Sequence, residues 1–253
     1  MNAPAGGVQV IARAAQILRA LEGQPRGLSL AQLADVVGLP RSTVHRIVSA
    51  LIAEGFLASA SPSGRVRIGP EFARLAWTGT AELWRSVEPF MQRIHDQLGE
   101  TVDCSILDGH RVRVIHVIPT RHELRAIADV GATFPLHSTS KGRAMLAVYD
   151  RPAARRMLPA DLERYTPKTV TTIDGVLLAI DQARQTGVAL DLEESTMGIC
   201  AAAIAVREPS GVLLAISVPV PVQRYECLAD KIIRVLGEVR KETLTAFGDA
   251  AAE

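Results

Sequence analysis

The sequence predicts an α+β protein of two domains: a small helical domain at the N-terminus, then a larger one that mixes strands and helices. Its 253 residues exceed the usual length of one domain, so two cores are expected. Apolar residues recur at three-to-four spacing up to about residue 55, whereas short apolar runs broken by turn residues dominate beyond Gly99. Because those runs do not alternate strictly with helices, we expect α+β rather than a doubly wound sheet.

Charge is unevenly distributed along the chain. The net charge is only +1, but residues 1–70 hold seven arginines against three acidic residues, and the remainder holds 21 Lys and Arg against 24 Asp and Glu. The basic character is thus confined to the N-terminal quarter, and a nucleic-acid partner is expected there.

Cysteine usage and hydropathy indicate the compartment. Cys104, Cys200 and Cys227 are odd in number and far apart, which suits a reducing environment and fits no disulfide framework. The longest apolar runs, within 198–206 and 212–218, are far shorter than the roughly 18 residues of a spanning helix. The N-terminus also lacks the layout of a signal peptide. We therefore expect a cytoplasmic protein with no membrane partner.

The N-terminal residues predict three helices. The first spans Val8–Leu21, and glycines and a proline follow it. Ser29 and Gln32 form a capping box that opens the second helix, and Gly38 ends it. Pro40 can begin the third without wasting an amide hydrogen. Its predicted buried stripe consists of Val44, Ile47, Val48, Leu51 and Ile52.

Beside that stripe the third helix carries hydrogen-bonding side chains, as the second helix of a helix-turn-helix does where it reaches base edges. Two short strands, 56–58 and 65–68, follow it and are joined by the turn-rich 59–64, which predicts a wing. The sequence thus predicts a winged helix-turn-helix over residues 1–70. An ordinary helical bundle with a solvated charged face is the alternative. The expected DNA-binding residues are Ser29, Arg41, Ser42, Thr43, His45, Arg46, Arg65 and Arg67.

Several segments resemble the isocitrate-lyase-regulator (IclR) family of transcription regulators. They are Arg13-Ala14, Leu30-Ala31-Gln32-Leu33-Ala34, Val37-Gly38-Leu39, Ser42-Thr43-Val44-His45-Arg46 and the stretch from Leu51 to Gly55. The resemblance continues along almost the whole chain. It implies a regulator rather than an enzyme, with no cofactor, that binds operator DNA as a homodimer, with pairing into tetramers as a further option. Repression is the commoner behaviour in the family.

Beyond the wing we expect a connector helix over 71–85 and an effector-binding domain over 86–253. A helix is predicted at 86–98, with Pro89 in its first turn, and the Asp108-Gly109 pair predicts a hairpin. The predicted strands are 102–107, 112–118, 124–127, 200–206 and 213–218. The predicted helices are 141–149, 152–157, 173–186 and 228–246.

The resemblance implies that this larger domain is GAF-like. The family signature stands here as Pro135-Leu136-His137-Ser138-Thr139-Ser140-Lys141-Gly142-Arg143-Ala144. Free amide hydrogens at this strand-to-helix junction would favour an anion such as a carboxylate. A capped helix with nothing bound is the alternative.

A second motif, Asp191-Leu192-Glu193-Glu194, precedes Gly198-Ile199-Cys200 and, one strand later, Ser217. By resemblance the small-molecule pocket is expected at Ser140, Lys141, Gly142, Asp191, Cys200 and Ser217. Ser140 and Lys141 would act mainly through backbone amides, and Asp191 would accept a hydrogen bond from a ligand hydroxyl or water. Ala203-Ile204 and Pro219 depart from the family pattern, so the ligand need not be the one that the best-known relatives bind. A small organic acid is expected, with an aromatic or catabolic carboxylate as the leading option.

Three other functions fit parts of the sequence. Cys104, His110, His116, His122 and His137 could ligate zinc, but they lack the usual ligand spacing. An enzyme could use Cys200 as nucleophile with His137 as base, although Cys200 begins an apolar run in which a thiol packs like alanine. A protein-interaction adaptor with a degenerate winged helix would have no use for the basic third helix.

Overall fold

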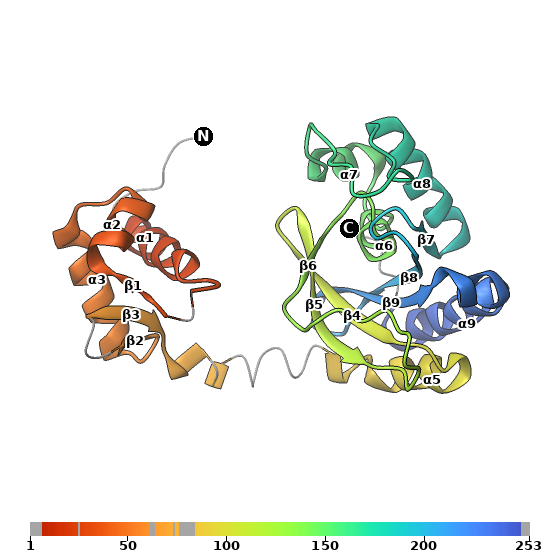
Figure 1. Ribbon diagram of the computed structural model, residues 1–253, viewed down its shortest axis with the longest axis horizontal. Helices are drawn as coiled ribbons and strands as arrows, with labels where there is room; N and C mark the ends of the chain where they lie inside the picture. The colour runs from red at the N-terminus through yellow and green to blue at the C-terminus, as the bar shows by residue number, and fades with distance from the viewer. Residues whose placement is uncertain (1–6, 25, 61–63, 73, 76–83, 249–253) are drawn as a thin grey trace. The chain divides into compact units, whose positions relative to one another are not determined.

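The structure is a computed structural model that describes residues 7–24, 26–60, 64–72, 74–75 and 84–248 (Figure 1). The chain divides into two compact units, residues 1–81 and 82–253. The expected connector helix is helical at 71–72, 74–75 and 84–85, and the rest of it lies outside the described residues. The predicted boundaries at residues 70 and 85 therefore stay predictions.

Three helices of the N-terminal unit surround one apolar core: α1 (Gly7–Ala20), α2 (Leu30–Val37) and α3 (Arg41–Ala53). The predicted capping box is present, because the Ser29 side chain accepts the Gln32 amide while the Gln32 side chain accepts the Ser29 amide. Gly38 ends α2 with a φ of 63°. The buried core residues include Ile17, Leu21, Leu33, Val44, Val48, Leu57 and Val66. Ile52 was predicted to be buried but is 37% exposed, since each helical residue turns about 100° from the one before it.

The predicted wing is present as an antiparallel sheet in the order β1-β3-β2. Its strands are β1 (Leu28–Ser29), β2 (Leu57–Ala60) and β3 (Arg65–Ile68). Strand β2 continues two residues into the predicted turn, of which residues 61–63 lie outside the described part. The two-residue β1 was not predicted, because no periodicity can show in so short a strand.

A six-stranded antiparallel sheet forms the centre of the C-terminal unit, in the order β6-β5-β4-β9-β8-β7. Its strands are β4 (Val102–Asp108), β5 (Arg111–Ile118), β6 (Thr133–Pro135), β7 (Ala189–Leu192), β8 (Ile199–Arg207) and β9 (Leu213–Pro221). The predicted hairpin joins β4 to β5, and Gly109 supplies its positive φ of 58°. The predicted α+β class is confirmed.

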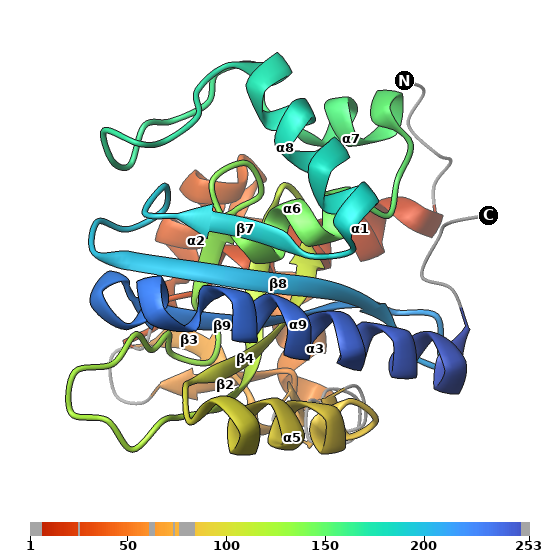
Figure 2. The same cartoon turned by 90° about the vertical axis from the view of Figure 1, so that its right-hand side faces the viewer.

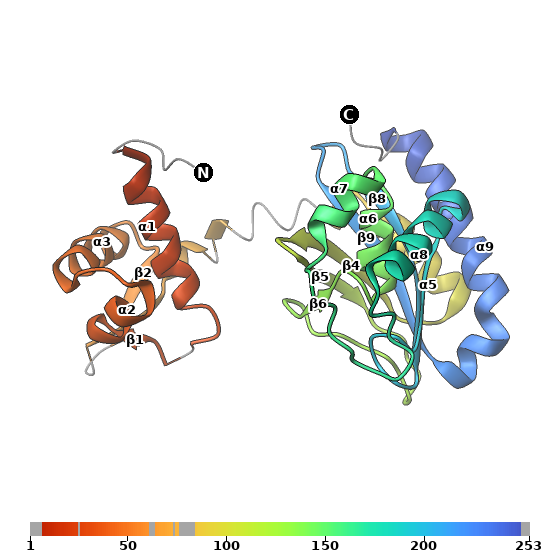
Figure 3. The same cartoon turned by 90° about the horizontal axis from the view of Figure 1, so that it is seen from above.

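Helices cover both faces of this sheet (Figures 2 and 3). Helices α5 (Glu88–Leu98) and α9 (Val222–Phe247) pack on one face, and α6 (Ser140–Leu146), α7 (Arg151–Met157) and α8 (Ile173–Thr186) lie on the other. Alternation along β9 assigns its side chains: Leu214 and Ile216 enter the core under α5 and α9, and Leu213 and Ala215 enter the core under α6 to α8.

Several predictions for this unit were wrong. Residues 124–127, predicted as a strand, form a loop with no strand partner, and Leu124 and Ile127 are 64% and 52% exposed. Strands β6 and β7 were not predicted, because β6 is short and β7 carries the acidic motif. Helix α9 begins six residues before its predicted start, α5 begins two residues after its own, and α6 ends at Leu146 instead of Tyr149.

Candidate functional sites: a recognition helix and a pocket

Helix α3 presents a polar face to solvent. The exposed residues are Arg41, Ser42, His45 and Arg46, while Val44 and Val48 face the core. Thr43 is half-buried on the side of the helix that faces α1. Five of the eight expected DNA-binding residues therefore lie on the first two turns of one helix.

The other three expected residues lie nearby in the small sheet. The hydroxyl of Ser29 accepts the Gln32 amide hydrogen at 3.2 Å, so its own hydrogen stays available. Arg65 donates from Nη1 to the carbonyl of Gly27 at 3.3 Å and is half-buried, so it helps to tie β3 to the start of β1. Arg67 is exposed. Of the two wing arginines, only Arg67 extends freely into solvent.

A cavity of about 280 Å³ opens in the C-terminal unit on the sheet face that α6 covers. It is walled by strands β4, β7, β8 and β9, the start of α6, and the loop before β6. Its lining residues are Asp103, Arg125, Ala126, Ile127, Ala128, Phe134, Thr139, Ser140, Lys141, Asp191, Ser195, Thr196, Ile199, Ala201, Ser217 and Pro219. Four of the six residues expected at the effector site thus meet in one pocket.

A buried ion pair lies in this pocket. The Lys141 Nζ donates to both carboxylate oxygens of Asp103 at 2.8 Å, and the two side chains are 8% and 1% exposed. The same ammonium lies 4.8 Å from the centre of the Phe134 ring. The Lys141 side chain is therefore held in the pocket wall by Asp103 and Phe134. The sequence had predicted that this residue acts mainly through its backbone amide.

Two hydroxyls in the pocket have no partner. Ser140 and Ser217 are fully buried, and neither Oγ atom makes a hydrogen bond with any residue that the structure describes. A buried hydroxyl without a partner costs free energy, on the order of 1–3 kcal/mol. A ligand that hydrogen-bonds to both would recover that cost.

Asp191 lies on β7, which forms one end of the pocket. Its Oδ1 accepts the amide hydrogens of Glu194 at 2.8 Å and Ser195 at 3.3 Å. Burial raises the pKa of Asp191 to about 7, and these two hydrogen bonds oppose the rise. Near neutral pH the carboxyl is therefore divided between charged and neutral forms, and the neutral form can donate a hydrogen bond.

Cys200 and Gly142, expected at the same site, do not line the pocket. Side chains alternate along β8, so Ile199 and Ala201 face the cavity while Cys200 enters the core beneath α9. Gly142 has a packing role: a Cβ there would lie 2.4 Å from the Leu136 carbonyl oxygen. Close approach of α6 to the residues after β6 requires glycine at this position.

The geometry does not favour the proposed Cys200–His137 nucleophilic pair. Burial raises the pKa of the Cys200 thiol. His137 hydrogen-bonds through Nε2 to the Glu163 carbonyl at 2.9 Å, and its ring lies 5.8 Å from the Tyr165 ring, measured between centroids. Within the described part of the chain, no three His, Cys, Asp or Glu side chains are placed to hold a metal ion. No helix among those residues is long and apolar enough to cross a membrane.

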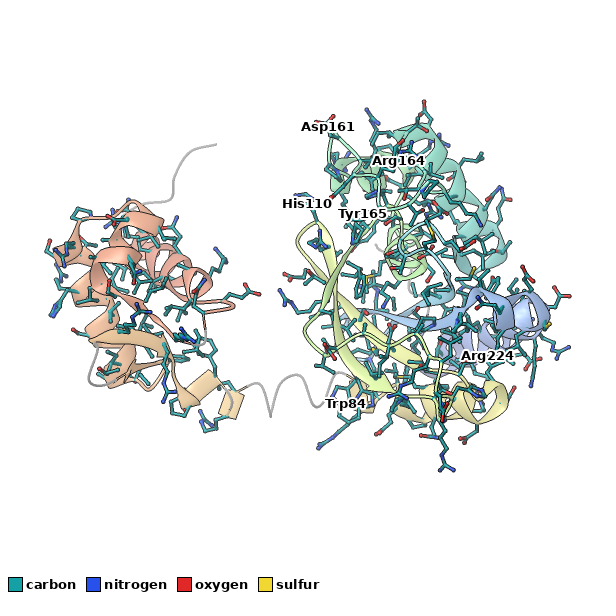
Figure 4. All side chains as sticks on the ribbon, viewed as in Figure 1. Trp84, His110, Asp161, Arg164, Tyr165 and Arg224 are labelled. Carbon is teal, nitrogen blue, oxygen red and sulfur yellow. The ribbon has the colours of Figure 1, made fainter. Side chains whose placement is uncertain are left out.

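Sequence reasoning missed several pocket residues. Asp103 is 38 positions from Lys141 and carries no motif of its own; only the pairing of Asp103 with Ser217 across β4 and β9 brings it to the site. Arg125, Ala126 and Ile127 were placed in the strand predicted at 124–127, and Ala128 in no element. The loop that carries these residues is anchored from outside the pocket by Arg224, which is labelled in Figure 4. Arg224 pairs with the buried Glu100 and donates to the Leu124 carbonyl at 2.9 Å.

Comparison with known proteins matches both units to models of one family. Residues 10–60 match the IclR helix-turn-helix domain, and residues 76–244 match the C-terminal domain of bacterial IclR transcriptional regulators. The HTH-type transcriptional regulator Rv1719 of Mycobacterium tuberculosis is 43% identical over 87% of this chain and 85% of its own. The transcriptional repressor IclR of Escherichia coli is 28% identical over 98% and 93%.

A solved structure has the same fold. An IclR homologue from Microbacterium hydrocarbonoxydans, in complex with 4-hydroxybenzoate, superposes with a TM-score of 0.76 at 23% identity, over 94% of this chain and 98% of its own. The fold, the helix-turn-helix and these matches define a DNA-binding transcription regulator, not an enzyme. The chain belongs to the IclR family.

Proposed function

We propose that α3 enters the major groove of operator DNA and that Arg41, Ser42, His45 and Arg46 contact it. The observation that carries this proposal is the exposed polar face of α3 in the part of the chain with excess arginine. Residues at the start of a recognition helix reach base edges, and arginine can bind guanine in two-point fashion. Ser29 and Arg67 would bind phosphates, and Thr43 and Arg65 would support the helix and the wing from the side.

The operator-bound form is a homodimer. Val10 and Ile11 on α1 are 56% and 71% exposed, and they line an apolar groove that continues to Ile47 and Leu51 on α3. A second copy would cover this groove and place two recognition helices on a two-fold-symmetric site. Pairing of dimers into tetramers is compatible with this arrangement. Because its partner is chromosomal DNA, the protein acts in the cytoplasm.

The effector is a small organic acid held in the pocket beside Lys141. Its carboxylate would accept hydrogen bonds from the unpartnered hydroxyls of Ser140 and Ser217 and from the neutral form of Asp191. Phe134 and Ile127 offer apolar surface for the rest of the molecule. The 4-hydroxybenzoate bound by the Microbacterium homologue is a ligand of this class.

Ligand capture alters DNA binding by favouring one arrangement of the connector segments, and the effect is limited by the difference in ligand affinity between the two arrangements. The protein acts as a repressor, as the E. coli relative does by name.

A salt-dependent anisotropy titration tests the DNA proposal, with the DNA that flanks the gene and a scrambled duplex as control. Arg46→Ala should weaken binding by about 1–3 kcal/mol, with relaxed sequence preference if Arg46 reads a base or a shallower salt slope if it meets phosphate. Arg19→Ala, an exposed arginine on α1, is the matched charge control. Equal losses in the two variants would refute the assignment of α3.

The pocket is tested with 4-hydroxybenzoate and other small acids as probes. Ser217→Ala should abolish a probe's effect on DNA binding and leave the affinity for DNA intact. Ser138→Ala is the matched control, because Ser138 also has a buried, unpartnered hydroxyl but does not line the pocket. An undiminished probe response in Ser217→Ala would remove the serine from the site.

A further inference from the structure

A second cavity of about 280 Å³ lies between the ends of α6 and α8, the strands β7 and β8, and helix α9. It shares no lining residue with the pocket described above. Its inner wall is made of alanines that come from four different elements: Ala144, Ala183, Ala189 and Ala205. Ala144, Ala183 and Ala189 pack together as a small buried cluster, and the open space lies over their methyl groups.

An arginine without a partner reaches this cavity from α9. The Arg240 guanidinium is partly buried, and it makes neither an ion pair nor a hydrogen bond with any described residue. Gly187 leaves room for this side chain, since a Cβ there would lie 3.0 Å from Cδ and 3.2 Å from Nε of Arg240. A guanidinium offers five N–H donors, and since no described residue accepts from those of Arg240, they are open to an acceptor that enters the cavity.

A second arginine shapes the mouth of the cavity. Arg184 donates to the carbonyls of Ala147 and Tyr149 at 3.2 and 2.7 Å and pairs with Asp181, so it ties the end of α8 to the end of α6. Asp150 also lines the cavity, but its Oδ1 caps α7 by accepting the Ala153 amide at 2.6 Å. The lining residues thus carry two positive charges and one negative charge.

We propose that this cavity is a second ligand site, for a short-chain aliphatic carboxylate. Its carboxylate would accept two parallel hydrogen bonds from Arg240, and its chain would lie on the alanine wall. The Asp150 carboxylate at the rim favours a singly charged anion over phosphate. The cavity lies at the small end of the range for ligand pockets, so it can hold only a small acid. The site does not depend on the DNA or effector proposals.

Titration of the full-length protein with propionate tests this site, with the arginine Nε–Hε resonances followed by NMR and chloride at equal ionic strength as the control anion. One resonance, absent from Arg240→Gln, should move saturably with propionate and stay in place with chloride. Arg234→Gln, an exposed arginine on the same helix, should bind propionate as the native protein does. Arg240→Gln should bind it at least about tenfold more weakly.

Two further variants distinguish binding inside the cavity from ion pairing of propionate with Arg240 at the surface. Ala205→Leu fills the cavity and leaves Arg240 in place, so it should abolish the saturable shift. Ser217→Ala, in the other pocket, should leave that shift unchanged. A shift that does not saturate, or one that persists in Ala205→Leu, would mean ion pairing at the surface only and would overturn the proposal.

Discussion

Asp191 should make the folded state less stable as pH rises. Its pKa is about 7 in the folded protein and near the ordinary 3.8 in the unfolded chain, so the folded state holds the proton more tightly. Stability is therefore lost as pH rises from about 4 to about 7, and it levels off above that. Three pKa units correspond to a loss on the order of 4 kcal/mol.

Asp191→Asn should remove this pH dependence, because the amide oxygen can still accept the Glu194 and Ser195 amide hydrogens without charge. Urea unfolding at pH 5 and pH 8 measures the effect. The variant should have the larger free energy of unfolding at both pH values, and its advantage over the native protein should grow by a few kcal/mol from pH 5 to pH 8. Parallel pH profiles for the two proteins would show that Asp191 is charged throughout.

The buried Lys141–Asp103 pair gives a second prediction at a single residue. Lys141→Met leaves the Asp103 carboxylate buried without its partner and should cost about 3–5 kcal/mol of unfolding free energy. Adding Asp103→Leu should restore most of that loss. Lys168→Met breaks the Lys168–Glu193 pair, in which the lysine is 62% exposed, and should cost far less, because solvent screens an exposed pair. Equal losses in the two lysine variants would contradict this account.

Two glycines in helices should respond oppositely to alanine. A Cβ at Gly142 meets Leu136 backbone atoms at 2.4 to 2.8 Å, so Gly142→Ala must move α6 away from its neighbour. A Cβ at Gly237 in α9 meets nothing within 4 Å, and Gly237→Ala should stabilise the protein by up to about 1 kcal/mol. Thermal unfolding checks both signs. If Gly142→Ala raised the unfolding temperature, the backbone at Leu136 would have to move away at no cost in free energy, which would contradict this account.

The elements that sequence predicts best here are those whose signals are local. The capping box at Ser29, the Asp108-Gly109 turn and the period of α8 each depend on residues within one turn or one helix. Residues 124–127 were misassigned because a short apolar run does not reveal whether it forms a strand or a loop beside a pocket. Whether Cys200 faces the pocket or the core beneath α9 depends on the register of β8 in the sheet, and the spacing of residues in the motif does not reveal that register.

At the scale of the molecule, the apolar groove between α1 and α3 should decide assembly through the N-terminal unit. Ile11 is 71% exposed at this groove, and Ile11→Glu would place a charge where a second copy is expected to pack. We expect weaker self-association in sedimentation experiments without DNA, and a corresponding loss of affinity for a site with two half-sites. Val36→Glu is the matched control, because Val36 is 65% exposed on α2 and lies outside the groove.

The effect on a single half-site separates assembly from direct DNA contact. Because Arg46 lines the same groove as Ile11, the half-site comparison uses Ile11→Ser and Val36→Ser, which add no charge. The two should bind a single half-site equally well, and the deficit of Ile11→Ser should appear only where two copies must bind together. If Ile11→Glu sediments like the native protein at every concentration, the groove is not the surface through which the copies associate.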